Sequence, residues 1–257
     1  MHTAKLAASL LVLFALTLIA APVRGETVNC TAITALPAVI TVQGVYCFTG
    51  DLSTGMTNGT AIEIQTNNVT LDLNGFKLGG LAAGLGTGTF GIYAGSRQNI
   101  TIKNGTIRGF RQAIVLEDSS LGQGHVVEDI RADHNTEFGI QVEGSGTIVR
   151  NNQVVATGGC TTLCGANASA FGIRVDGTGP RVLNNDVITV TKQGTGIARG
   201  IHVVGSIGAL VVNNRITEAD RGIEYHAATS STGKFRDNIT FDVTTPYTGG
   251  TNIGNNN

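Results

Sequence analysis

The sequence predicts an all-β protein whose short strands stack in parallel, coil upon coil, as a solenoid. Three observations favour this fold class: one strand-forming motif recurs along most of the chain, no stretch of helical periodicity separates its copies, and the composition suits strands and tight turns. The 257 residues include 36 Gly but no Trp, and only 14% are charged. Because 41% of the residues are hydrophobic, the composition excludes an intrinsically disordered chain.

The repeat is built from two short motifs. In the first, Gly or Ala precedes Ile, one variable residue and an apolar residue, as in residues 138–142 (Phe-Gly-Ile-Gln-Val). In the second, apolar residues precede Asn-Asn or a close variant, as in residues 149–152, 182–185 and 212–214. Both motifs alternate with a period of two, so each predicts a strand. Copies of the first motif start at Phe90, Gln112, Phe138, Phe171, Arg199 and Arg221.

A solenoid explains how such strands pair without helices between them. Parallel strands normally need a helical crossover, whereas in a solenoid each strand pairs with its copy one coil away. Inward Ile, Val and Leu then fill one continuous core, and Asn at the bends tolerates left-handed backbone angles and forms side-chain ladders. A β-propeller or β-sandwich is the alternative, but both need antiparallel hairpins at a spacing that the Asn-Gly turns do not show.

In this repeat pattern the chain resembles the right-handed parallel β-helix proteins of the pectate-lyase-like superfamily, over about residues 60–241. The resemblance implies a secreted module that binds or modifies sugar polymers. It transfers no catalytic residue. Of the polygalacturonase segments Asn-Thr-Asp, Asp-Asp, Gly-His-Gly and Arg-Ile-Lys, the chain has only Gly124-His125-Val126 in place of the third, and it lacks the Asp-Pro-His segment of mannuronan epimerases.

The chain divides into four predicted segments. Residues 1–25 combine Lys5, an apolar run and small residues, the pattern of a cleaved secretory signal peptide, with an N-terminal membrane anchor as the alternative. Residues 26–60 are predicted to cap the solenoid, residues 61–241 to form the β-helix, and residues 242–257 to form a C-terminal tail. We therefore expect a secreted, periplasmic or cell-surface protein with no membrane span after signal cleavage.

Charge argues against a nucleic-acid partner. The full chain has 17 basic and 18 acidic residues, and removing residues 1–25 takes away Lys5 and Arg24 but no acid, which leaves a net charge of 15 − 18 = −3. Such a chain offers no basic footprint for a phosphate backbone.

Export would place the four cysteines in an oxidising compartment, where an even set favours disulfides. Of three possible pairings we expect the local one, Cys30 with Cys47 and Cys160 with Cys164, which would close the N-terminal segment and tie off a surface loop. A zinc site on the Cys-x3-Cys spacing is the alternative, although it lacks a nearby His or second cysteine pair.

The candidate functional residues lie on the outward side of the first motif. If its Ile points into the core, the next residue and the one two positions later point outwards. Equivalent residues on adjacent coils should lie about 4.8 Å apart. We call these two outward columns the charged strip. Coil by coil, the first column reads Tyr93, Val115, Gln141, Arg174, His202 and Glu224, and the second reads Gly95, Glu117, Glu143, Asp176, Val204 and His226.

Three interpretations of the charged strip compete. Glu117, Glu143 and Asp176 could hold Ca²⁺ while Arg174 or His202 removes a proton, as in a polysaccharide lyase. Alternatively, neighbouring carboxylates such as Glu143 and Asp176 could divide acid and base roles, as in a glycoside hydrolase. In the third interpretation the polar side chains simply solvate an exposed sheet face. The strip residues expected to contact substrate are Tyr93, Glu117, Gln141, Glu224 and His226.

The sequence therefore predicts a secreted β-helix that binds an extracellular or cell-envelope polysaccharide, with lyase or hydrolase activity left open. No cofactor other than Ca²⁺ is expected. The alternative function is that of a non-catalytic structural or adhesive surface protein whose partner is another protein.

Overall fold

The computed structural model describes residues 27, 29–118, 122–161, 163–229 and 231–257. The predicted signal peptide, residues 1–25, lies outside this set. Within the described residues, no helix combines the length and the apolar character needed to cross a membrane.

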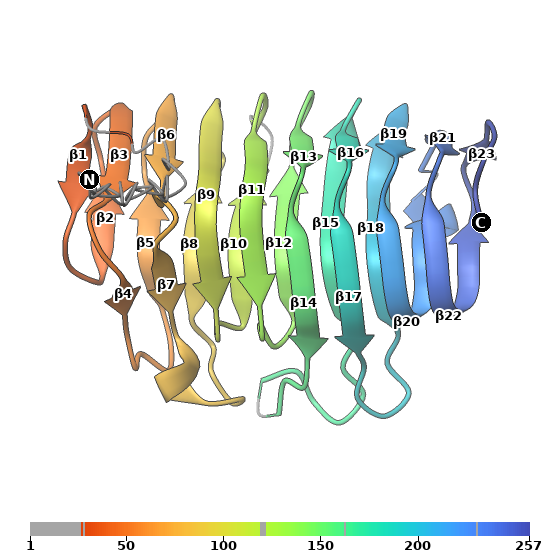
Figure 1. The fold of residues 1–257 in the computed structure, drawn as a ribbon, viewed down its shortest axis with the longest axis horizontal. Coiled ribbons are helices and arrows are strands. Elements are labelled where there is room, and N and C mark those ends of the chain that lie inside the picture. Colours follow the sequence, from red (N-terminus) through yellow and green to blue (C-terminus); the bar gives the residue numbers. More distant parts are fainter. Residues whose placement is uncertain (1–26, 28, 119–121, 162, 230) are drawn as a thin grey trace, which may run out of the picture.

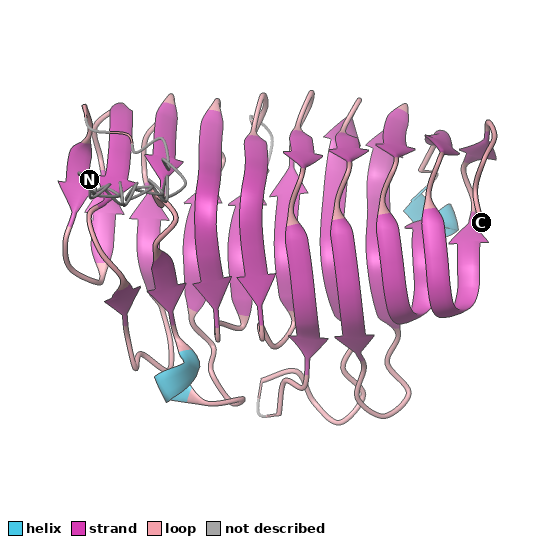
Figure 2. Cartoon of the chain, viewed as in Figure 1, coloured by secondary structure: helices cyan, strands magenta, loops and turns pink. Residues whose placement is uncertain are grey.

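The chain forms a right-handed parallel β-solenoid whose coils stack along the long axis, with β1 at one end and β23 at the other (Figure 1). Strands make up nearly all of the regular structure (Figure 2). The described residues add two short 3₁₀ helices, η1 (Leu81–Ala83) and η2 (Ala227–Thr229). The predicted fold class is confirmed.

Each coil contributes strands to three sheets. Sheet 1 contains β2 (Ala38–Ile40), β5 (Thr60–Ile64), β8 (Phe90–Gly95), β10 (Gln112–Glu117), β12 (Phe138–Glu143), β15 (Ala170–Thr178) and β18 (Ala198–Ile207). Sheet 2 contains β1 (Thr31–Ile33), β3 (Gly44–Phe48), β6 (Val69–Asp72), β13 (Ile148–Arg150), β16 (Arg181–Leu183), β19 (Ala209–Val212), β21 (Gly233–Arg236) and β23 (Thr251–Asn252). Sheet 3 contains β4 (Leu52–Ser53), β7 (Lys77–Gly79), β14 (Gln153–Gly158) and β17 (Asp186–Thr191).

Four of the described strands pair in two sheets in succession. β9 (Ile100–Arg108) and β11 (Val126–Asp133) pair first in sheet 2 and then in sheet 3. β20 (Arg215–Tyr225) and β22 (Ile239–Thr248) pair first in sheet 3 and then in sheet 1.

The Gly-Ile motif sets the register of sheet 1. Its Ile residues pair from coil to coil and point into the core, where each is at most 1% exposed: Ile92, Ile114, Ile140, Ile173, Ile201 and Ile223. The glycine is required by close approach of the next coil. A Cβ on Gly172 would lie 2.6 Å from the carbonyl oxygen of Gly200, well inside contact distance.

Asparagines form the bends between sheets 2 and 3, as the sequence predicts. The first residue of each pair adopts the left-handed conformation, with φ of 56° at both Asn151 and Asn184. The second is buried and bonds to its equivalent on the next coil, so that the Asn185 Nδ2 atom donates to Asn214 Oδ1 at 2.9 Å. We call this buried series the asparagine ladder: Asn152, Asn185, Asn214 and Asn238.

Strands continue beyond both predicted boundaries of the solenoid. β2 pairs with β5 before residue 61, and β22 pairs with β20 through Thr248. Strand pairing thus continues past residue 241, through a segment that contains Pro246. Pro246 is tolerated since β22 lies near the end of the stack, where a missing backbone donor leaves few partners unpaired.

Both predicted cysteine pairs lie at disulfide distance. Cys30 pairs with Cys47, and Cys160 with Cys164, with Cα atoms 5.8 Å apart in each pair. The first joins the segment before β1 to β3, and the second closes a turn in the loop between β14 and β15.

Candidate functional site

The two columns of the charged strip lie on the outward face of sheet 1 in the predicted register. Gln141 pairs with Arg174, Arg174 with His202, and His202 with Glu224. In the second column, Glu143 pairs with Asp176. The geometry of this face decides which of these side chains remain available for chemistry.

Glu143 lies at the centre of the charged strip, and both of its oxygens are engaged. Oε1 accepts from the Arg174 guanidinium at 2.6 Å and from Gln141 Nε2 at 2.8 Å. Oε2 accepts from the backbone N–H of Asp118 at 3.2 Å. Because the donors already use most of its lone pairs, Glu143 has little capacity left to act as a general base or to ligate Ca²⁺.

The other two carboxylates of the predicted calcium site have separate partners. Asp176 accepts from the backbone N–H of Gly177 at 2.6 Å, and Glu117 accepts from the Tyr93 hydroxyl at 2.9 Å. Burial, followed by this bond to Glu117, raises the pKa of Tyr93. Among the described residues, Glu117, Glu143 and Asp176 do not belong to a group whose oxygens converge closely enough to share an ion.

Glu224 is held at the C-terminal end of the charged strip by two arginines. It is 2% exposed, and its Oε2 lies 2.5 Å from Arg199 Nε, while Oε1 bonds to the Arg221 guanidinium. A carboxylate can be buried to this degree because charge-assisted bonds offset its desolvation.

His202 lies beside Glu224 and is 6% exposed. Its Nε2 is 3.9 Å from Glu224 Oε2, and neither ring nitrogen has a hydrogen-bond partner among the described residues. Burial, reinforced by the positive charge of Arg199, lowers the pKa of His202 to about 3. The imidazole is therefore neutral at physiological pH.

A third outward column, which the sequence analysis did not identify, borders the charged strip. It consists of the residue before each motif glycine or alanine. The rings of Phe138 and Phe171 stack with centroids 4.6 Å apart, and the guanidinium of Arg199 lies over Phe171. Because these side chains cover each other's faces, they form an internal stack rather than an open platform for sugars. The motif shows that a residue precedes each glycine or alanine, but whether its side chain points inwards or outwards depends on the local backbone at the glycine.

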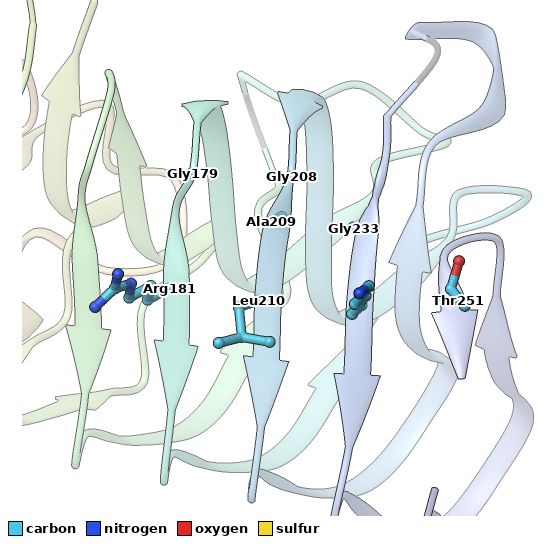
Figure 3. A pocket seen from close by; sticks show the side chains of 8 residues that line it. Gly179, Arg181, Gly208, Ala209, Leu210, Gly233 and Thr251 are labelled. Carbon is cyan, nitrogen blue, oxygen red and sulfur yellow. The ribbon is translucent and has the colours of Figure 1, made fainter. Parts of the chain in front are cut away.

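A second candidate surface lies on a different sheet. On the outward face of sheet 2, near the C-terminal end, a groove of about 490 Å³ crosses β16, β19, β21 and β23. Arg181, Leu210, Lys234 and Thr251 pair in register across these strands and line the groove. Figure 3 shows Arg181 and Leu210 on neighbouring strands, with the Gly233 strand between Leu210 and Thr251. Gly179, Gly208 and Gly233 contribute to the groove without side chains, which leaves the space open.

The two cations of this sheet-2 groove differ from those of the charged strip. Arg181 and Lys234 are exposed, and neither takes part in the ion pairs found among the described residues. Leu210 lies between them in register and is half-buried. The sequence analysis did not identify this site. Its alternation does predict that Arg181, Leu210 and Lys234 point outwards, since each directly precedes an inward residue: Val182, Val211 and Phe235.

Comparison with known proteins places the fold in a family. No curated protein matches the chain. A solved structure described as "Crystal structure of Agl-KA catalytic domain" is similar at 12% identity and a TM-score of 0.34, over 86% of this chain; the chain spans 58% of that structure's length. The family described as "Right handed beta helix region" matches residues 39–198, which is more than half of the sequence. The chain therefore belongs to the right-handed β-helix family.

Proposed function

We propose that the protein binds an acidic polysaccharide non-covalently in the sheet-2 groove. The observation that carries this proposal is the open groove of about 490 Å³ in which Arg181 and Lys234 have no carboxylate partner among the described residues. Exposed cations without an intramolecular partner attract anions of complementary geometry.

The layout of the groove suits an extended polymer. Arg181 and Lys234 are two rungs apart, so their Cα atoms are separated by roughly 10 Å along the solenoid axis. A uronate chain running along that axis can place one carboxylate against each cation, with the Arg181 guanidinium able to bind in a bidentate manner. Leu210 between them offers an apolar contact for the C–H face of a sugar ring.

The charged strip is a less suitable polysaccharide-binding surface than the sheet-2 groove. Its side chains are even less suited to catalysis. The carboxylates proposed as acid, base or calcium ligands are bonded within the protein, as Glu143 is to Arg174 and Gln141. A reaction there would first have to break these contacts. Tyr93 and Glu117, whose bond to each other is exposed, form the part of the strip most accessible to a ligand.

The test is titration of the purified protein with polygalacturonate, alginate and a neutral glucan, monitored by calorimetry. We expect binding of the acidic polymers but not of the neutral one. The Arg181→Ala/Lys234→Ala double variant should bind about tenfold more weakly, since two exposed charge contacts contribute about 1.4 kcal/mol together. Arg150→Ala is the matched control, because Arg150 lies on the same sheet but is paired with Glu128 at 2.6 Å.

Several outcomes would overturn this assignment. If no acidic glycan binds, or if Arg150→Ala weakens binding as much as the double variant, the groove is not the site. Weakening by Tyr93→Phe or Arg174→Gln alone would move the site to the charged strip. Formation of unsaturated products from polyuronates, lost in Glu143→Gln, would establish lyase activity instead.

A further inference from the structure

Two histidines and a glutamate converge at the C-terminal end of the charged strip. His202, Glu224 and His226 each offer one ligand atom, and these atoms all lie within 4.8 Å of one another. His202 comes from β18 and the other two from the end of β20 and the residue after it. Backbone pairing of His202 with Glu224 fixes this proximity, because it places the two on adjacent rungs.

His202 is the observation that points to a ligand. The residue is 6% exposed, and both ring nitrogens are buried without a hydrogen-bond partner among the described residues. Leaving a buried polar group unpaired costs about 1–3 kcal/mol, so native structures rarely retain one without a reason. The ring is already fixed in place by stacking on Phe171, with centroids 5.2 Å apart.

The distances allow a small ion to bridge the three side chains. Two ligand atoms held about 2.1 Å from one tetrahedral ion are about 3.4 Å apart. His202 Nε2 and Glu224 Oε2 are 3.9 Å apart, so a side-chain movement of well under 1 Å would bring them to that spacing. A metal ion fits where a larger ligand could not, because His202 and Glu224 are both buried.

Arg199 and Arg221 act on this site through their bonds to Glu224. Each donates to a different oxygen of Glu224, which orients the carboxylate and leaves one lone pair on each oxygen for another partner. Their positive charge also opposes a cation. We therefore expect weaker binding than in closed structural zinc sites, together with an effect of the arginines on affinity.

We propose that His202, Glu224 and His226 bind a Zn²⁺ ion. Two neutral imidazoles with one carboxylate form a donor set that favours zinc and neighbouring transition metals over Ca²⁺ and Mg²⁺, which prefer oxygen ligands. Three protein ligands leave a fourth position for water. This proposal is independent of polysaccharide binding in the sheet-2 groove, since the two sites share no residue.

The experiment is calorimetric titration of tag-free protein, stripped with a chelator, with ZnCl₂ and separately with CaCl₂. We expect one Zn²⁺ per chain and no Ca²⁺. His202→Phe keeps an aromatic ring against Phe171 but removes both nitrogens, and it should weaken zinc binding at least tenfold. His134→Ala is the control and should bind as the wild type does, because His134 is exposed, directly follows β11 and contacts Asp133 rather than the proposed ligands.

Thermal unfolding provides a second readout that does not depend on the heat of binding. Zinc should raise the melting temperature of the wild type and of His134→Ala, because a ligand that binds only the folded state stabilises it, and should leave that of His202→Phe unchanged. His226→Ala serves the same purpose if His202→Phe does not fold. Zinc binding that is absent in the wild type, unchanged in folded His202→Phe or His226→Ala, or lost in His134→Ala would overturn the proposal.

Discussion

The charged strip and the sheet-2 groove use similar residues in opposite ways. Arg174 on the strip and Arg199 and Arg221 beside it all donate to glutamates of the strip, and Glu224 is buried between two of them. In the groove, Arg181 and Lys234 face solvent on either side of Leu210. The difference teaches that a concentration of charge in the sequence does not by itself mark a binding surface.

The physical reason lies in the partners that each column receives from its neighbours. Residues on adjacent rungs are about 4.8 Å apart, so opposite charges in neighbouring coils pair with each other before they can bind a ligand. The column through Arg181 instead places Leu210 and Thr251 beside its cations. A charge flanked by uncharged neighbours stays available.

The largest expected effect is on the strip. Glu224→Gln would leave the buried guanidinium of Arg199 and that of Arg221 without a counter-charge, and breaking such a buried pair costs about 3–5 kcal/mol. Arg181→Gln in the groove should change stability by less than about 0.5 kcal/mol. Urea unfolding of both variants measures this difference, and equal losses of stability would erase the contrast between the two regions.

Burial of an imidazole should also make the stability of the protein depend on pH. His125, which is 1% exposed and immediately precedes β11, has its pKa lowered by burial to about 4 from an ordinary 6.5. The unfolded chain therefore binds more protons between these values, and stability should fall as pH drops from about 6.5 to about 4, by up to about 3 kcal/mol. His125→Asn can still accept from the Ile100 N–H and should flatten this slope in urea unfolding followed from pH 7.5 to pH 4.5. An unchanged slope would show that other groups carry the pH dependence.

A smaller loss is expected at the centre of the strip. Glu143→Gln removes the charge from the bond to Arg174, both partners being mostly buried, and should reduce the free energy of unfolding by about 2 kcal/mol. The Arg150→Ala variant breaks an exposed pair and should cost no more than about 1 kcal/mol. If both variants lose the same free energy of unfolding, the Glu143–Arg174 pair stabilises the fold no more than an exposed ion pair does.

The smallest effect concerns salt. Raising ionic strength shortens the screening length from about 10 Å at 0.1 M to about 3 Å at 1 M, so binding of an acidic polymer by exposed Arg181 and Lys234 should weaken several-fold over that range. Stability of the protein itself should change little, because the strip pairs are shielded from solvent. Calorimetry and urea unfolding at the two salt concentrations separate these quantities, and salt-insensitive binding would argue for apolar contacts through Leu210.

The sequence predicted those features that follow from the period of the repeat. The inward Ile column, the left-handed Asn151 and Asn184, and the outward Arg174 and His202 all depend only on alternation and on equal spacing from coil to coil. The disulfide pairs could be predicted because their cysteines are close along the chain.

The availability of side chains could not be predicted in the same way. Whether Glu143 contacts Arg174 or solvent depends on side-chain conformations, which the pattern does not specify. The outward direction of Phe171 and Arg199 depends on the irregular pairing at the motif glycine, which breaks simple alternation. The sheet-2 groove exists because Gly179 and Gly208 leave space beside Arg181, and glycines in a chain rich in them carried no distinguishing signal.

The asparagine ladder has a consequence for how such a protein can change length. Between sheets 2 and 3, the bend from β13 to β22 is always an asparagine or aspartate followed by asparagine, so this corner has a constant length of two residues. Between sheets 3 and 1, residues 159–169 separate β14 from β15, residues 192–197 separate β17 from β18, and β20 runs through without interruption. The corner between sheets 2 and 3 thus keeps a constant length, whereas the corner between sheets 3 and 1 varies in length from coil to coil. Peptide insertions should therefore disturb the stack least at the corner between sheets 3 and 1.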